Sequence, residues 1–190
     1  RLNDKITSSP LLFVGSNDIN QNNIYKLKST PLDQGSTIFT TDDIELSINK
    51  TSKTIKAISK GNVGSSIIFT GGLLTNWKIN YSSKINFDKS RSKLSPGISK
   101  SGLTGCVSFH DIKLKNASIT VNNSNCEDGI HFLRASGNIN KIIINNSISD
   151  GIDIDFSNLR INKIIVNNAL NDCIDLSNGN YVISEAKLNN

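Results

Sequence analysis

Acidic residues and one histidine recur at a fixed interval in the last third of this 190-residue chain. His131, Asp153 and Asp175 are 22 residues apart, and Asp155 stands two residues after Asp153. A second series has the same interval and comprises Asp128, Asp150 and Asp172, with Glu127 beside the first. If each interval is one coil of a repeating fold, each series forms a column with steps of about 4.8 Å.

Carboxylates stacked at that distance repel one another, so the columns require compensation. A hard cation such as Ca²⁺ binds several carboxylate oxygens, and the candidate metal ligands are Asp153, Asp155 and Asp175. Alternatively, one carboxyl keeps its proton through a raised pKa, as a general acid requires. The candidates for such catalysis are Asp150, Asp153, Asp172 and Asp175.

The series that begins at Asp128 also has a structural explanation, because Asp before Gly often accepts backbone hydrogen bonds in a turn. No turn requires the other series, which contains His131. We therefore expect His131 and Asp155 to contact a ligand.

Two further segments show the element that positions these residues. INKIIINN (139–146) and INKIIVNN (161–168) are 22 residues apart, and ISEAKLNN (183–190) keeps the step. β-Branched residues that alternate with period two predict strands, and 22 residues leave no room for a crossover helix. Stacked asparagine pairs can bond along such a ladder and tolerate tight corners. The sequence therefore predicts an all-β chain, a single right-handed parallel β-helix with about 22 residues per coil in its C-terminal half.

Alternation along the predicted strands assigns each side chain to a face. The outward positions include His131, Asp153 and Asp175. The inward positions are Ile130, Phe132, Ile152, Ile154, Phe156, Ile174 and Leu176.

The first half of the chain is less regular. We expect strands at 36–39, 44–49, 54–59, 65–70, 76–81 and 107–114, arranged as wider, imperfect coils. Residues 1–30 are interpreted as a cap or lead-in and 31–190 as the β-helix. The last residues keep the coil step without a capping pattern, so we expect a continuing chain or end-to-end stacking on a partner.

A basic segment interrupts the strands at 84–104. It contains a single acidic residue, Asp88, and is expected to form a long loop that contacts an anionic ligand. Its cations are Lys84, Lys89, Arg91, Lys93 and Lys100.

Charge and composition narrow the function classes. Residues 1–115 carry 16 Lys and Arg against 8 Asp and Glu, and residues 116–190 carry 5 against 8, which gives +8 and −3. This asymmetry predicts an anionic partner for the first part and a separate acidic site on the second. Basic residues without interleaved aromatics do not favour nucleic acid, and no apolar run is long enough to span a membrane.

The three cysteines, Cys106, Cys126 and Cys173, lack metal-finger spacing. Three reduced, buried cysteines are the favoured interpretation, and one disulfide with a free thiol is the alternative.

The segments SDGIDIDFS (149–157) and NDCIDLSNGNYVI (171–183) resemble β-helix repeats of the pectin-lyase-like superfamily. Residues 100–190 are most similar to bacterial β-helix regions associated with spore-coat-protein-H-like proteins. That likeness rests on Leu103-Thr104-Gly105, Glu127-Asp128, Ser149 to Phe156, and Asn171 to Asp175. It implies a secreted or cell-surface bacterial module, located outside the cell or in its envelope.

A second resemblance is to polygalacturonase-type hydrolases, which carry Asn-Thr-Asp followed one coil later by Asp-Asp. The matching positions are Asp150 and Asp172. Here Ile148-Ser149 replaces Asn-Thr, Asn171 replaces the first Asp of the pair, and neither Gly-His-Gly nor Arg-Ile-Lys follows.

Together these observations predict a non-catalytic or scaffolding module that contacts anionic or neutral polysaccharide. The alternative is a polysaccharide hydrolase, lyase or epimerase that uses the stacked carboxylates. A lyase needs a basic residue nearby, for which the candidates are Arg134, Arg160 and Lys163.

Overall fold

The chain coils into a β-solenoid of about 5 turns, with a spacing of about 23 residues. This computed structural model describes residues 27–61, 64–84 and 103–189. Each turn contributes one strand to each of two sheets, so the chain is nearly all β, as predicted.

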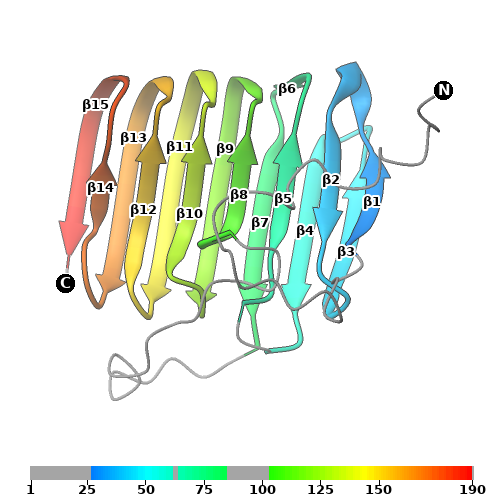
Figure 1. Ribbon diagram of the computed structural model, residues 1–190, viewed down its shortest axis with the longest axis horizontal. Helices are drawn as coiled ribbons and strands as arrows, with labels where there is room; N and C mark the ends of the chain where they lie inside the picture. The colour runs from blue at the N-terminus through cyan, green and yellow to red at the C-terminus, as the bar shows by residue number, and fades with distance from the viewer. Residues whose placement is uncertain (1–26, 62–63, 85–102, 190) are drawn as a thin grey trace, which may run out of the picture.

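Two sheets form the walls of the solenoid (Figure 1). Sheet A has the order β1-β2-β5-β8-β10-β12-β14, and sheet B has the order β15-β13-β11-β9-β7-β4-β3, with β6 added beside β9. The strands of sheet A are β1 (Lys28–Pro31), β2 (Thr37–Thr40), β5 (Ile67–Thr70), β8 (Gly105–His110), β10 (Asp128–Leu133), β12 (Asp150–Asp155) and β14 (Ile174–Leu176). Those of sheet B are β3 (Ile44–Asn49), β4 (Thr54–Ser59), β6 (Leu73–Thr75), β7 (Lys78–Ser83), β9 (Lys113–Ser124), β11 (Ser136–Ser147), β13 (Asn158–Ala169) and β15 (Asn180–Asn189).

The coil is right-handed, in agreement with the prediction. In Figure 1 the nearer strands β8, β10 and β12 run upward, the farther strands β9, β11 and β13 run downward, and the chain advances from right to left. This is the hand that twisted parallel strands favour in a crossover.

The coils keep one register although their lengths differ. Paired residues are 22 apart from β10 to β12 and from β11 to β13, 23 apart from β8 to β10, and 24 apart from β4 to β7. Ile67 pairs with Val107 and Ile79 with Ile119, a separation of 40 residues in both sheets. The additional residues fall between β7 and β8, so this insertion leaves the core columns aligned.

The core between the sheets is a stack of like residues. Phe69, Phe109 and Phe132 stack on three successive coils, with ring centroids 5.0 and 4.9 Å apart. Isoleucines and valines fill the neighbouring columns, so that Ile130, Ile152 and Ile154 are fully buried. Such columns of dry, interdigitated side chains stabilise stacked strands.

The prediction that Phe156 points inward was wrong. Phe156 follows the end of β12, adopts a left-handed φ of 48°, and is 61% exposed. The left-handed residue reverses the alternation at the corner, so Phe156 leaves the core. Leu176, in the last coil, is also exposed at 45%.

Glycine in the Asp-Gly-Ile repeat has a packing reason. A Cβ on Gly151 would lie 2.6 Å from the carbonyl oxygen of Cys173, and one on Gly129 would lie 2.7 Å from that of Gly151. The backbone of the next coil therefore passes too close for any larger residue.

Asparagine ladders hold the corner that precedes each Asp-Gly-Ile segment, as predicted. The Asn145 side chain donates to Asn122 at 2.9 Å and accepts from Asn167 at 2.9 Å, and Asn189 extends the ladder. A parallel ladder runs through Asn123, Asn146 and Asn168, all with positive φ. Asparagine tolerates this left-handed conformation better than most residues.

The first strands depart from the parallel pattern expected from residue 31 onward. β1 pairs antiparallel with β2, β2 with β5, and β3 with β4. Parallel pairing begins with β4 against β7 and β5 against β8. The single strand expected at 107–114 is in fact two strands, β8 and β9, separated by Asp111 and Ile112. Most of the predicted cap at 1–30 lies outside the described residues.

The favoured interpretation of three reduced cysteines was also wrong. Cys106 and Cys126 form a disulfide that closes a loop between neighbouring coils, with a sequence separation of 20. Cys173 lies outside this disulfide and is partly buried.

Candidate functional site

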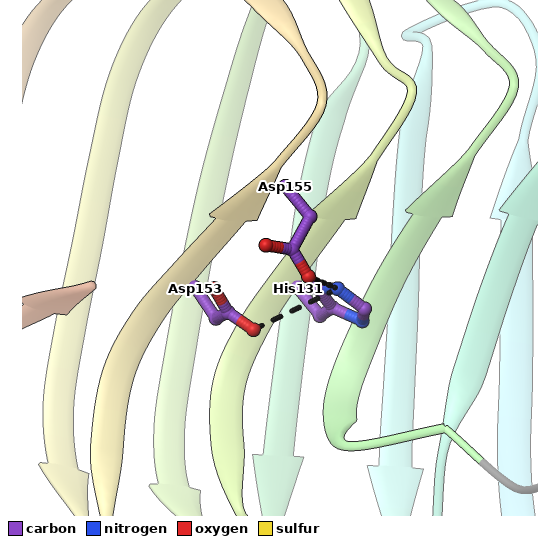
Figure 2. A group of neighbouring side chains, drawn as sticks. All are labelled: His131, Asp153 and Asp155. Carbon is purple, nitrogen blue, oxygen red and sulfur yellow. Dashed lines mark hydrogen bonds and ion pairs between the residues drawn. The ribbon is translucent and has the colours of Figure 1, made fainter. Parts of the chain in front are cut away.

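The outward face of sheet A brings three of the predicted residues together. His131 pairs with Asp153, and Asp153 pairs with Asp175, so the predicted column exists. Figure 2 shows the carboxylates of Asp153 and Asp155 turned toward the imidazole of His131. The distances from His131 Nε2 are 3.3 Å to Asp155 Oδ2 and 3.7 Å to Asp153 Oδ2.

His131 is outward-facing yet buried, with 7% exposure. Its Nδ1 lies 3.2 Å from the hydroxyl oxygen of Thr104, and the ring edge of His110 packs against it at 5.8 Å between centroids. Burial lowers the pKa of His131, an effect that the hydrogen bond to Asp155 opposes. One nitrogen of the imidazole is therefore directed at a hydroxyl and the other at two carboxylates.

Asp153 is the carboxyl most altered by this column. Burial, followed by the charges of Asp155 and Asp175, raises its pKa to about 7. Because a carboxyl in this state is half protonated near neutral pH, Asp153 can either donate a proton or lose it to bind a cation. Asp175 is exposed and does not belong to the group whose donor atoms converge.

The corner series divides into different roles. Asp150 Oδ1 accepts hydrogen bonds from the backbone N–H of Asp172 at 2.8 Å and from the side chain of Asn171 at 2.7 Å. This fastens one coil to the next, which is the structural role expected of a corner aspartate. Asp172 itself is exposed.

Asp128, in the same series, is different because it is 2% exposed. Burial raises its pKa to about 8, an effect that a hydrogen bond with Thr104 opposes and that the charges of Asp153, Glu127 and Asp150 increase. Its Oδ2 finds no hydrogen-bond partner among the described residues. A buried polar atom without a partner is unusual and marks a strained or ligand-binding position.

His110 is a second unusual group at this site. It is fully buried, and neither ring nitrogen has a hydrogen-bond partner in the described part of the chain. Burial and the neighbouring His131 lower its pKa to about 4. No sequence pattern indicated a role for His110. The residue paired with it in the next coil, Leu133, is 23 positions later and apolar, so no polar repeat marks this position.

The outward column of sheet A changes character along the solenoid. Its successive members are Phe39, Ile68, Ser108, His131, Asp153 and Asp175. The apolar end is covered, since Phe39 and Ile68 pack with Leu103 and Leu27 in a small cluster outside the main core. The acidic end is the open part of this column within the described residues, so this face presents a discrete site and not a continuous surface.

Sheet B presents a chemically opposite outer surface, here called the basic face. Lys78, Ser118, Lys141, Lys163 and Glu185 form one column, and Lys115, Asn138, Arg160 and Val182 form another. The cations of the sheet B strands are Lys56, Lys78, Lys113, Lys115, Lys141, Arg160, Lys163 and Lys187, and the anions are Glu45 and Glu185. Lys163 and Glu185 form an ion pair.

The charge is therefore divided by face within each coil. The described strands of sheet A contain five carboxylates, at Asp128, Asp150, Asp153, Asp155 and Asp175, against one cation, Lys28. The described strands of sheet B contain eight cations against two carboxylates. The expectation of a basic first part and an acidic second part of the chain missed this arrangement, because counting along the chain adds both faces of each coil together.

The predicted basic loop is described only at its ends, namely Lys84, Leu103 and Thr104. Lys89, Arg91 and Lys93 lie outside the described residues, so their predicted role in ligand contact stays a prediction. Of the predicted lyase bases, Arg134 forms a two-point ion pair with Asp111 at 2.7 and 2.8 Å, and Arg160 and Lys163 belong to the basic face, in the sheet opposite Asp153.

Within the described residues, no helix has the length and apolarity needed to cross a membrane. No protein-family model, no curated protein and no solved structure matches this chain.

Proposed function

We propose that this β-solenoid is a polysaccharide-contacting module and that its partner is an anionic polysaccharide bound along the basic face. The observation that carries the proposal is the columnar arrangement of cations on sheet B. Lys141 and Lys163 occupy directly opposed positions on adjacent strands, where like charges destabilise the pair. An anionic chain lying across the coils would remove that repulsion.

The chemistry of the basic face favours charge recognition over sugar stacking. Trp77 and Tyr81, the large aromatics of the neighbouring coils, are buried in the core. Ile143 and Ile165 lie half-buried between the cations in the column that runs from Lys56 to Lys187. The described strands of sheet B carry long cationic side chains and no aromatic residue of the exposed class. Such a surface is suited to carboxylate, sulfate or phosphate groups on a flexible polymer.

The resemblance to pectin-lyase-like and spore-coat-protein-H-like β-helices supports this proposal, because it implies a secreted or cell-surface module. It rests on the repeat motifs of residues 100–190. The proposed location, outside the cell or in its envelope, follows from that resemblance.

Affinity electrophoresis of the purified chain tests the proposal. We expect retardation in gels containing polygalacturonate or heparin and none in gels with dextran, with loss of retardation above a few hundred millimolar salt because exposed charges are screened. The variant Lys78→Glu/Lys141→Glu/Lys163→Glu should lose retardation, and the control variant Asp153→Asn/Asp155→Asn/Asp175→Asn should keep it.

Three outcomes would overturn the assignment. Binding that is unchanged in the triple lysine variant places the contact elsewhere. Tighter binding to duplex DNA than to polyanionic glycans at equal salt would instead indicate a nucleic-acid partner. Absence of retention on any anionic or neutral glycan, with and without Ca²⁺, would remove the polysaccharide proposal altogether.

The second candidate function is a polysaccharide-cleaving enzyme, and the raised pKa of Asp153 favours it. A carboxyl that is still protonated near neutral pH is suited to protonate a glycosidic oxygen, and Asp155 and Asp175 beside it supply carboxylates for the other half of the reaction. Release of reducing ends or unsaturated products from a polysaccharide panel, abolished in Asp153→Asn, would establish this function. An inactive wild-type protein on every polysaccharide that it binds would exclude it.

A further inference from the structure

The donor atoms of His131, Asp153 and Asp155 converge on one point of the acidic face. One ligand-type atom from each residue lies within 4.8 Å of the other two, and the two separations from His131 Nε2 are 3.3 and 3.7 Å. Two atoms bound to one Zn²⁺-sized ion at 2.0–2.2 Å and a tetrahedral angle are about 3.3–3.6 Å apart. The two separations from His131 Nε2 are thus close to those between ligands that share one ion.

The hydrogen bonds behind His131 fix the orientation of its ring. Thr104 lies 3.2 Å from Nδ1 and also forms a hydrogen bond with Asp128. If the threonine hydroxyl donates to Asp128, its oxygen can accept the proton of Nδ1. A bound cation would then replace the proton between Nε2 and Asp155, and the lone pair of Nε2 would be directed at the cation. A carboxylate or hydroxyl that holds the second nitrogen of a histidine in this way is typical of metal ligands.

Two buried polar groups at the same place lack partners among the described residues. Asp128 Oδ2 and both nitrogens of His110 are unpaired, although these residues are only 2% and 0% exposed. His110 contacts the edge of the His131 ring. A buried polar group without a hydrogen-bond partner destabilises the fold, and a bound ion with its water molecules would supply partners that the described side chains do not.

The donor set decides the class of ion. Ca²⁺ takes six to eight oxygen ligands at 2.3–2.6 Å, whereas this group offers one imidazole nitrogen and two carboxylates. Imidazole combined with carboxylate suits Zn²⁺, Mn²⁺, Fe²⁺ or Co²⁺, and three protein ligands leave positions open for water or a bound molecule.

We propose that His131, Asp153 and Asp155 bind one transition-metal dication on the acidic face, with Thr104 and Asp128 positioning His131. The site belongs to sheet A and does not depend on polymer binding by sheet B. It also differs from the carboxylate-only Ca²⁺ site expected from the sequence, because Asp175 stands outside it and a histidine stands within it.

Titration of the full chain with Co²⁺ and Zn²⁺ after removal of metal by a chelator tests the proposal. The protein should carry Cys173→Ser, so that the thiol outside the disulfide does not bind metal. We expect one Co²⁺ per chain with visible absorption bands of a low-symmetry site, displaced by an equivalent of Zn²⁺. Ca²⁺ in tenfold excess should not displace Co²⁺.

Variants distinguish the site from loose surface binding. His131→Gln and Asp155→Asn should weaken Co²⁺ binding at least a hundredfold, Thr104→Val about tenfold with the three ligands intact, and Asp175→Asn less than twofold. Circular dichroism of each variant checks the fold, and Thr104→Val provides a test if a ligand variant is unstable.

Three results would overturn the proposal. These are the absence of Co²⁺ binding, equal affinity in Asp155→Asn and Asp175→Asn, and displacement of Co²⁺ by Ca²⁺. In the first case a proton would hold His131 between the two carboxylates, and its nuclear magnetic resonance signals would titrate as a histidine with an ion-pair partner.

Discussion

The outward faces of sheets A and B are built from the same coils but differ in how they hold charge. On sheet A, charged side chains are few, and three titratable ones, His131, Asp153 and Asp155, are at least partly buried and directed toward one another. On sheet B, cations are numerous, mostly exposed and spread along the whole length of the sheet. The comparison shows that a solenoid wall with one shared core can form a discrete site on one side and an extended electrostatic surface on the other.

The largest expected effect comes from the core that both faces share. Phe109→Ala should lower the free energy of unfolding by about 3–5 kcal/mol, because it removes the middle ring of the Phe69-Phe109-Phe132 stack. Denaturant unfolding measures the change, with Phe156→Ala, an exposed phenylalanine, as the control expected within about 0.5 kcal/mol. If Phe109→Ala impaired metal binding on sheet A but left glycan binding on sheet B intact, the two faces would not share one cooperative core.

A second test concerns the cost of ionising the buried carboxyl of Asp128, which is on sheet A. Asp128 has a pKa of about 8 in the folded protein against an ordinary value of 3.8, so the folded state keeps a proton that the unfolded state loses between those values. The favourable contribution of this bound proton to the free energy of unfolding is therefore fully present below about pH 4. It declines by up to about 1.4 kcal/mol per pH unit until about pH 8. Asp128→Asn should remove this decline and become more stable than wild type, by a few kcal/mol at pH 8.

Urea unfolding from pH 4 to 9 in the presence of a chelator measures that difference. Since His110 is present in both proteins, its opposite pH dependence cancels from the comparison. Asp172→Asn, at the exposed end of the same corner series, is the matched surface control. Parallel curves for wild type and Asp128→Asn would show that Asp128 is not a destabilising buried carboxylate.

A smaller effect is expected at the asparagine corner, which borders sheet B. Asn145→Ala removes two ladder hydrogen bonds and leaves Asn122 and Asn167 each with one fewer partner, so a loss of about 1–3 kcal/mol is expected. Asn189→Ala removes one bond at an exposed end and should cost less. Thermal unfolding compares the stability of the two variants. Equal losses would mean that the hydrogen bonds inside the ladder stabilise the fold no more than the bond at its end.

The smallest effect on stability is expected from the ion pair between Lys163 and Glu185 on the basic face. Glu185→Gln breaks this contact, but both groups are exposed, so the free energy of unfolding should change by less than about 1 kcal/mol. Removal of the anion should nevertheless strengthen binding to anionic glycan about twofold in low salt. Weaker glycan binding would contradict the proposed role of the basic face.

The coil and its columns could be predicted because the repeat fixes both. A 22-residue step that carries β-branched alternation and aligned asparagines determines the register, and the pairing of His131, Asp153 and Asp175 follows from it. The repeat alone therefore assigns side chains that are far apart in the chain to one face of the solenoid.

Features that depend on a corner or on burial could not be predicted in this way. Period-two alternation does not foresee the left-handed φ of Phe156, which ends the alternation. The pairing of Cys106 with Cys126 connects two coils at positions that no repeat marks. The burial of Asp128 and His110 depends on the packing of side chains outside the sheet, about which the repeat carries no information.

The insertion between β7 and β8 has a consequence for how such a protein changes over evolutionary time. The separation of paired residues rises to 40 there, yet both sheets continue with their columns aligned. Since the cost of closing a flexible loop grows by only about 0.6 kcal/mol for each doubling of its length, this corner can gain or lose residues almost independently of the core. New sequence can therefore be inserted between β7 and β8 while the strands that hold His131 and the lysines keep their register.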